Sequence, residues 1–204
     1  MGIRMNLRNS NKNIAFLSGS AFTILAPEYQ TAPIVFASPH SGSDYPEEFL
    51  LLSCLDPLTL RRSEDAFVDE LFGQVYRLGA PLLAAQFPRV YVDANREIDE
   101  LDPSMFNGDL PENMNTRSLR VLAGLGTIAK IVSDGQEIYN SSLRYTDIKR
   151  RIEQCYIPYH RALRGLVEST IRRFGICLII DCHSMPSNRY LPRGVQDDNP
   201  ANLV

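Results

Sequence analysis

Two histidines of this sequence follow apolar runs that have the length and composition of buried strands. His40 lies in Ser-Pro-His-Ser-Gly directly after the run 33–37, and His183 lies in Asp-Cys-His-Ser directly after the run 176–180. β-Branched and aromatic residues in a short apolar run favour a strand, and turn-forming residues mark its end. In open α/β sheets, the loops that leave the carboxyl ends of the strands bind ligands. We therefore expect both imidazoles at one edge of a sheet.

A neighbouring acidic pair supplies a candidate third ligand for a metal ion. Glu64 and Asp65 stand near the start of a helical pattern, where a carboxylate can also simply cap the helix or complement its dipole. Two histidines and one carboxylate make the ligand set of a catalytic zinc ion that keeps one position for water. Zinc lowers the pKa of such a water toward ~7 and polarises a carbonyl, as amide hydrolysis requires. The alternative is two hydrogen-bonded histidines at a sheet edge without a metal.

Three further polar residues are candidates to serve such a site. Asp181, two residues before His183, is placed to accept a hydrogen bond from that imidazole and fix its orientation. Arg96 follows the apolar run 89–92 and is either a surface salt-bridge partner or a bidentate clamp for a substrate carboxylate. His160 falls on a long helical pattern, where a lone histidine is more often a packing or surface residue than a catalytic one.

The remaining strands and loops follow from short apolar runs and turn signals. Strands are predicted at 22–25, 81–85 and 89–92. The segment 97–119 is rich in Asp, Asn, Pro and Gly and has no periodicity, which predicts a long loop. Loops of this length in a compact domain often have a function.

Two stretches have the periodicity of helices. Apolar residues at three- and four-residue spacing predict a helix over 59–78, which Gly79 ends. A second helix is predicted over 145–174, and Pro158 should kink it or divide it in two because proline lacks the backbone N–H. Gly175 then ends this helix before the second histidine segment.

Length and composition indicate one soluble domain spanning 1–204. The chain has 44% hydrophobic and 22% charged residues, and its net charge of -3 gives no reason to expect nucleic acid or an acidic membrane as a partner. Four cysteines without disulfide-framework spacing favour the cytoplasm. The apolar stretch 14–26 is interrupted at 18–20, which favours a disordered start over about 1–20 rather than a cleaved signal.

Five sequence blocks, in this order, resemble the N-formylglutamate amidohydrolase family, and the resemblance extends over about 22–193. The blocks are 38–42, 63–71, 92–96, 158–160 and 181–185. The family is similar to the zinc carboxypeptidases. The resemblance implies an α/β fold of the phosphorylase/hydrolase-like type, a three-layer α/β/α sandwich around a mixed sheet. It also implies hydrolysis of N-formyl-L-glutamate to formate and L-glutamate, a step of histidine breakdown.

The resemblance assigns roles to individual residues. His40 and His183 match the family's histidine positions and are the expected ligands of one Zn²⁺ ion, with Asp65 as the third ligand and Glu64 as its alternate. The pair 95–96 (Asn95 and Arg96) resembles the Asn-Arg pair that holds a substrate carboxylate in carboxypeptidase-like enzymes, so the expected partner is a small acidic N-acyl amino acid.

Two features of the family leave alternatives open here. His160 matches a family position that either contacts the substrate or supports a residue that does. Family members run on past the second histidine, and a late glutamate there resembles the carboxypeptidase general base. The chain ends at Val204, so we expect a C-terminally truncated domain without this base. The alternatives are a zinc hydrolase of another N-acyl amino acid or small peptide, or an inactive relative that binds an acidic ligand without turnover.

Overall fold

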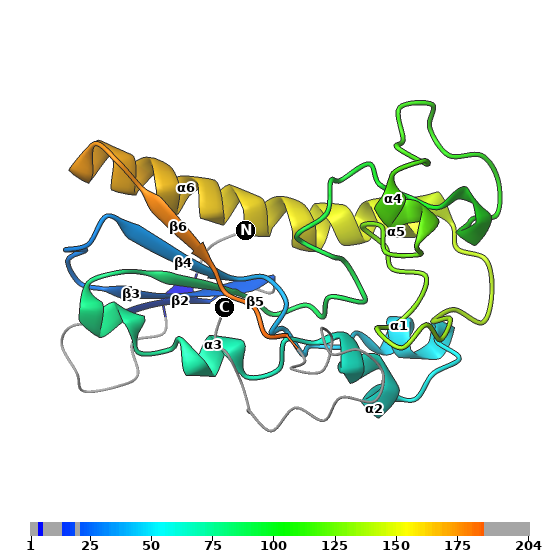
Figure 1. Ribbon diagram of the computed structural model, residues 1–204, viewed down its shortest axis with the longest axis horizontal. Helices are drawn as coiled ribbons and strands as arrows, with labels where there is room; N and C mark the ends of the chain where they lie inside the picture. Colours follow the sequence, from blue (N-terminus) through cyan, green and yellow to red (C-terminus); the bar gives the residue numbers. More distant parts are fainter. Residues whose placement is uncertain (1–3, 6–13, 19–20, 186–204) are drawn as a thin grey trace, which may run out of the picture.

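A six-stranded mixed sheet forms the centre of the protein, with strand order β1-β2-β3-β5-β4-β6 (Figure 1). The computed structural model describes residues 4–5, 14–18 and 21–185. The strands are β1 Arg4–Met5, β2 Ile14–Ser18, β3 Phe22–Pro27, β4 Ile34–Ser38, β5 Leu82–Ala85 and β6 Leu178–Asp181. β1, β2, β3 and β5 pair antiparallel in that order, whereas β4 is parallel to both β5 and β6. The carboxyl ends of β4 and β6 therefore meet at one edge of the sheet.

Four of the predicted strands are confirmed as β3, β4, β5 and β6, but the predicted strand at 89–92 is wrong. The backbone N–H groups of Tyr91 and Val92 both donate to the carbonyl of Pro88, so the segment is a turn. Its apolar side chains are nevertheless buried in the core, which explains why the pattern resembles a strand. The first 20 residues, where we expected disorder, contain β1 and β2. The rest of that segment, and the end of the resembling region beyond Met185, lie outside the described residues.

Helices lie against both faces of the sheet. The helical segments are α1 Glu47–Leu52, α2 Pro57–Leu60, η1 Arg61–Ser63, α3 Val68–Leu71, η2 Val75–Leu78, η3 Pro103–Met105, α4 Leu119–Leu122, α5 Tyr145–Arg151, η4 Ile152–Tyr156 and α6 Ile157–Phe174. The long helix α6 runs along one face and contacts β4 and β5, while α3 and η2 lie on the other (Figure 1). None of the helices described here is both long enough and apolar enough to cross a membrane.

The predicted helix over 59–78 is broken into α2, η1, α3 and η2. The break lies around Asp65, whose backbone N–H donates to the carbonyl of His40 at 3.0 Å. Just after it, Phe67 takes a left-handed conformation with φ 65°, which is unfavourable for a bulky side chain. The tertiary contact at Asp65 thus overrides the local helical pattern. Gly79 ends the last of these segments with φ 78°, as predicted.

The predicted long helix is confirmed, and a π-turn divides it. α5, η4 and α6 follow one another without a gap, and η4 is the π-helical turn. The backbone N–H of Ile157 donates to the carbonyl of Ile152, five residues back instead of four. Pro158 follows at the second position of α6, where its missing N–H is tolerated. Gly175 ends the helix with φ 77°, as predicted.

The segment between β5 and α5 has little regular structure and contributes much of the core. The predicted loop over 97–119 is confirmed, apart from the single turn η3. Leu101, Ile128 and Ile138 of this segment are fully buried. They belong to the same core as Phe49 of α1 and Ile148 of α5. All four cysteines are free. Short turns of the chain, together with α1 and α5, enclose this side of the core.

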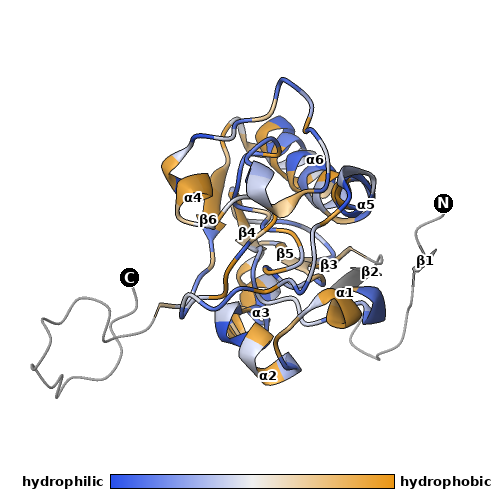
Figure 2. Ribbon diagram, turned by 90° about the vertical axis from the view of Figure 1, so that its right-hand side faces the viewer, coloured by the Kyte–Doolittle hydropathy of each residue, from blue (hydrophilic) through white to orange (hydrophobic). Residues whose placement is uncertain are grey.

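β6 is an edge strand with apolar side chains exposed to solvent. Among the described residues, β6 pairs only with β4. Leu178 and Ile179 are 53% and 46% exposed, whereas the four residues of β5 are buried. The expectation of a buried second strand is therefore wrong for β6. Figure 2 shows hydrophobic residues of β6 and α4 on the same side of the molecule. An open apolar strand edge favours pairing with another chain.

We expect this edge to cause concentration-dependent self-association. The substitution Ile179→Lys should shift the chain toward monomer in sedimentation velocity experiments, because a charge on an edge strand disfavours strand pairing. Leu122→Lys, which removes a more exposed apolar side chain from α4, away from the strand edge, is the control and should leave association unchanged. A wild-type chain that stays monomeric at high concentration would contradict this expectation.

Candidate metal centre

The loop after β4 is shaped so that His40 turns back toward the sheet edge. Ser38, the last residue of β4, is fully buried and its hydroxyl donates to the Ser41 hydroxyl at 2.8 Å. A Cβ atom at Gly42 would lie 2.3 Å from the Phe87 carbonyl oxygen, so only glycine permits this close passage of the chain. The Ser-Pro-His-Ser-Gly sequence is thus a tight, buried turn that fixes His40.

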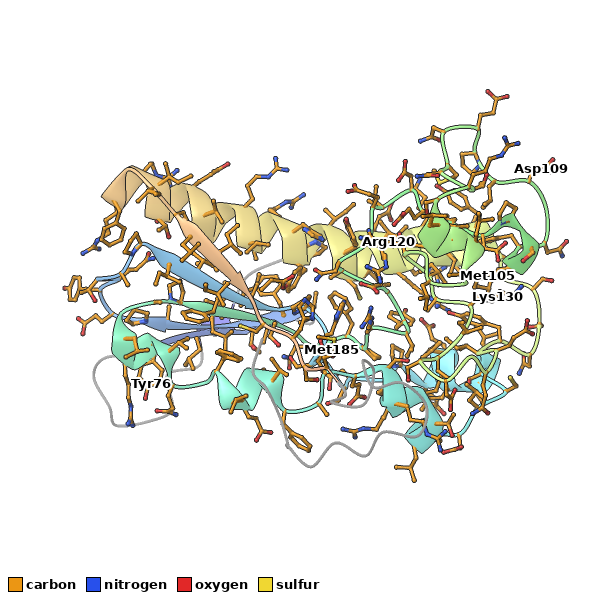
Figure 3. The ribbon with its side chains drawn as sticks, in the orientation of Figure 1. Tyr76, Met105, Asp109, Arg120, Lys130 and Met185 are labelled. Carbon is orange, nitrogen blue, oxygen red and sulfur yellow. The ribbon has the colours of Figure 1, made fainter. Side chains whose placement is uncertain are left out.

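Three predicted ligands, His40, Asp65 and His183, come together at this edge. Asp65 Oδ2 lies 2.7 Å from His183 Nδ1 and 3.6 Å from His40 Nδ1. One potential ligand atom from each residue lies within 4.8 Å of the other two. His183 follows the carboxyl end of β6 and precedes Met185, which is labelled in Figure 3, by two residues. The arrangement joins residues that are far apart in the sequence.

The donor atoms of this cluster suit a cation. His40 is only 2% exposed, and its Nδ1 atom has no hydrogen-bond partner among the described residues. A buried polar nitrogen without a partner is unfavourable, and a bound ion would satisfy it. Two imidazole nitrogens and one carboxylate oxygen form the ligand set that zinc takes in catalytic sites. The residues present therefore fit the zinc ion that the sequence predicts.

A carboxylate orients each histidine from the far side of its ring. His40 Nε2 lies 2.8 Å from Asp93 Oδ1, and His183 Nε2 lies 2.9 Å from Asp181 Oδ2. A carboxylate at Nε2 keeps the proton on that nitrogen, so that Nδ1 is the nitrogen able to bind a metal. Nδ1 of His40 is unpaired among the described residues, whereas Nδ1 of His183 is hydrogen-bonded to Asp65. Sequence analysis anticipated the position of Asp181 but gave Asp93 no role. The signal for Asp93 was its place, like that of His40, directly after a buried apolar run.

The charges in the cluster are strongly coupled. Burial by itself would raise the pKa of Asp65, but the hydrogen bond with His183 and the nearby imidazole of His40 outweigh it and hold the pKa below its ordinary value. The pKa of Asp93 is lowered in the same way, against the effect of burial, by His40 and Arg89. Hydrogen bonds to Asp181 and Asp65 raise the pKa of His183 to about 9. The carboxylates are therefore ionised at neutral pH and favour positive charge between them.

Glu64, the alternate ligand, points away from the cluster. Its Oε1 atom accepts a hydrogen bond from the Tyr45 hydroxyl at 2.7 Å, and its Oε2 atom lies 3.1 Å from Arg61 Nη2. The side chain is only 2% exposed in this position. Neighbouring residues thus have different surroundings, and Asp65 is the carboxylate that the structure brings to both histidines.

Asn95 and Arg96 lie beside the cluster. The Asn95 side-chain amide donates to Asp181 Oδ2 at 2.8 Å. Arg96 Nε donates to the Leu125 carbonyl at 3.0 Å, and Nη1 donates to the Asn95 carbonyl at 3.0 Å. The guanidinium is partly buried, and Nη2 makes no hydrogen bond with the described residues. One edge of this side chain is therefore fixed, and Nη2 remains able to bind a ligand.

His160 contacts the backbone of the same turn. Its Nε2 atom lies 2.9 Å from the Ala94 carbonyl oxygen, and because a carbonyl only accepts, Nε2 carries the proton. Burial lowers the pKa of His160, which favours the neutral ring. The sequence left open whether His160 contacts the substrate or supports a residue that does. The observed contact is with the backbone.

The fold and this cluster define an α/β protein with a candidate metal centre of two histidines and one aspartate at the carboxyl edge of a mixed sheet. The family model for N-formylglutamate amidohydrolase matches residues 32–201. The chain therefore belongs to the N-formylglutamate amidohydrolase family, which confirms the resemblance found in the sequence.

Individual relatives agree with this family. The crystal structure of N-formylglutamate amidohydrolase from Ralstonia eutropha JMP134 matches 89% of this chain and 64% of its own, with 39% identity and a TM-score of 0.78. An N-formylglutamate deformylase of Pseudomonas putida is 26% identical over 161 residues, 76% of this chain and 53% of its own length. The P. aeruginosa deformylase is 23% identical over 158 residues. The chain thus spans about half the length of these curated relatives.

We expect metal binding to depend on both histidines. After zinc loading and removal of free metal, His40→Ala and His183→Ala should lose stoichiometric zinc in elemental analysis, because each removes one of three protein ligands. Glu64→Gln is the matched control and should keep its zinc, since Glu64 lies outside the cluster. Unchanged zinc content in both histidine variants would exclude this site.

The role of Asp93 can be tested separately. Asp93→Asn keeps the shape of the side chain but removes the charge that faces His40, so zinc affinity should fall by about 10- to 100-fold in chelator competition. Asp134→Asn, which removes a carboxylate paired with Arg62 on the surface, is the control. Equal affinities of the two variants would show that Asp93 does not support the metal ligand.

Proposed function

We propose that this chain binds one zinc ion through His40, Asp65 and His183 and hydrolyses the formyl amide of N-formyl-L-glutamate to formate and L-glutamate, as in histidine degradation. The observation that carries the proposal is the convergence of these three side chains, with the buried Nδ1 atom of His40 unpaired among the residues that the structure describes. Family membership supports the substrate. When bound, zinc would lower the pKa of a water toward ~7 and polarise the formyl carbonyl.

The surrounding residues supply orientation and substrate binding. Asp93 and Asp181 hold the two imidazoles so that both Nδ1 atoms lie on the side of Asp65. Arg96 presents Nη2 for a carboxylate of the substrate, and a planar guanidinium suits this partner better than an ammonium group. Asn95, next to Arg96 in the sequence, contacts Asp181 and His183, so a carboxylate held at Arg96 would place the rest of the substrate near the cluster.

Hydrolysis also needs a group that takes a proton from water. The water oxygen bonds to the formyl carbon, the C–N bond breaks, and the amino group leaves with a proton. Asp181 contacts the far nitrogen of His183, and Glu64 is paired with Tyr45, so neither is placed for this role. We infer that the acceptor is supplied by a segment outside the described residues. The same segment would complete a three-layer α/β/α sandwich. The free cysteines suit the proposed cytoplasmic location.

The proposal is tested by measuring formate release from N-formyl-L-glutamate by the zinc-loaded chain. We expect release that a chelator abolishes and that is slower with N-acetyl-L-glutamate, because a pocket for a formyl group should reject a longer acyl chain. Arg96→Lys should raise KM more than it lowers kcat, whereas Arg62→Lys, at an exposed side chain paired with Asp134, should not.

Binding of L-glutamate, followed by calorimetry, separates the alternatives. A folded, zinc-loaded chain that binds L-glutamate but releases no formate would support a relative that binds without turnover. Faster hydrolysis of a different N-acyl amino acid would instead identify that compound as the preferred substrate. A folded, zinc-loaded chain that neither binds L-glutamate nor releases formate would refute the proposal.

A further inference from the structure

The backbone of the turn 93–96 is held at every carbonyl that follows Asp93. The Ala94 carbonyl accepts a hydrogen bond from His160 Nε2 at 2.9 Å, and the Arg96 carbonyl accepts one from the Tyr156 hydroxyl at 2.8 Å. Between them, the Asn95 carbonyl accepts from Arg96 Nη1 at 3.0 Å. At the start of the turn, Asp93 Oδ1 accepts from the Asn95 backbone N–H at 2.8 Å. The turn therefore has little freedom to change its shape.

Two of these bonds come from one stripe of the long helix. Tyr156 and His160 are four residues apart, which places them on the same side of a helix. Their ring centroids lie 4.2 Å apart, so the two rings support one another. Tyr156 is the last residue of the π-turn η4 and donates to Arg96, and His160 lies on α6 and donates to Ala94. The hydrogen bond of each side chain is with a backbone carbonyl of the turn.

The π-turn sets the direction from which these side chains approach. A π-turn inserts one extra residue and so rotates the helix before it by about 100° relative to the helix after it. The rotation takes place within 152–156, immediately before His160 and Pro158. Single π-turns inside α-helices are frequent at functional sites. Here the π-turn lies against the turn that carries Asn95 and Arg96.

We propose that Tyr156 and His160 are positioning residues that hold the 93–96 turn so that Asn95 and Arg96 can bind the substrate carboxylate. The inference rests on the proposed function, and of the two roles left open for His160 it favours support of a substrate-binding residue over contact with the substrate. Asn95 also donates to Asp181, which orients His183. The helix therefore sets the distance between the carboxylate-binding residues and the metal centre.

The test compares variants of the full, zinc-loaded chain. Tyr156→Phe and His160→Leu each remove one donor, and each should weaken L-glutamate binding in calorimetry and raise KM by about tenfold, as expected for one lost hydrogen bond. Zinc content and kcat should change much less, because no metal ligand is touched. His160→Gln keeps an N–H donor and should restore most of the affinity. Tyr76→Phe, at the opposite end of the sheet (Figure 3), is the control.

A double-mutant cycle distinguishes positioning from general destabilisation. If Tyr156 acts through Arg96, Tyr156→Phe should cause no further loss of L-glutamate binding in an Arg96→Ala background. Full additivity in this cycle would overturn the inference. If Tyr156→Phe and His160→Leu both bind L-glutamate as tightly as the wild-type chain, the positioning role is refuted and the proposed function is not. A wild-type chain that binds no L-glutamate would instead overturn the proposed function on which the inference rests.

Discussion

Hydrogen bonds between carboxylates and imidazoles organise this protein. Asp93 binds the far nitrogen of His40, and Asp181 binds the far nitrogen of His183, so both near nitrogens lie on the side of Asp65. The backbone depends on the same contacts, because Asp65 also donates its N–H to the His40 carbonyl and breaks the helical pattern there. A charged cluster that is only partly exposed is stable when each charge has a partner, and each of these carboxylates has one.

Much of the sheet and the identity of the cluster could be predicted from sequence. The strand at 33–37 followed by a turn, and its counterpart at 176–180, placed two histidines at one edge, as observed. The break in the predicted helix at 59–78 could not be predicted, because it depends on the hydrogen bond that the Asp65 N–H donates to the carbonyl of His40, in the loop after β4. The turn at 89–92 was predicted as a strand because most of its side chains are apolar and buried. Its apolar pattern reports burial and not backbone conformation.

Residues that act on other residues were harder to find than those that act on a ligand. Asp93 follows an apolar run as His40 does, but its role is clear only from the 2.8 Å contact with His40 in the structure. Glu64 and Asp65 are equivalent in sequence, and the neighbours Tyr45 and Arg61 distinguish them in space. The exposure of β6 was also hidden, because an apolar strand does not reveal whether it lies at the centre or the edge of a sheet.

The strands that precede the two histidines differ in how many neighbouring strands they pair with. His40 follows β4, which has a paired strand on each side, whereas His183 follows β6 at the border of the sheet. An ion bound to both would act as a cross-link that fastens the border strand to the interior. Its binding energy would then contribute to local folding as well as to chemistry. Loss of the ion would first free the end of β6. The metal centre would then be disrupted whenever that single strand frays.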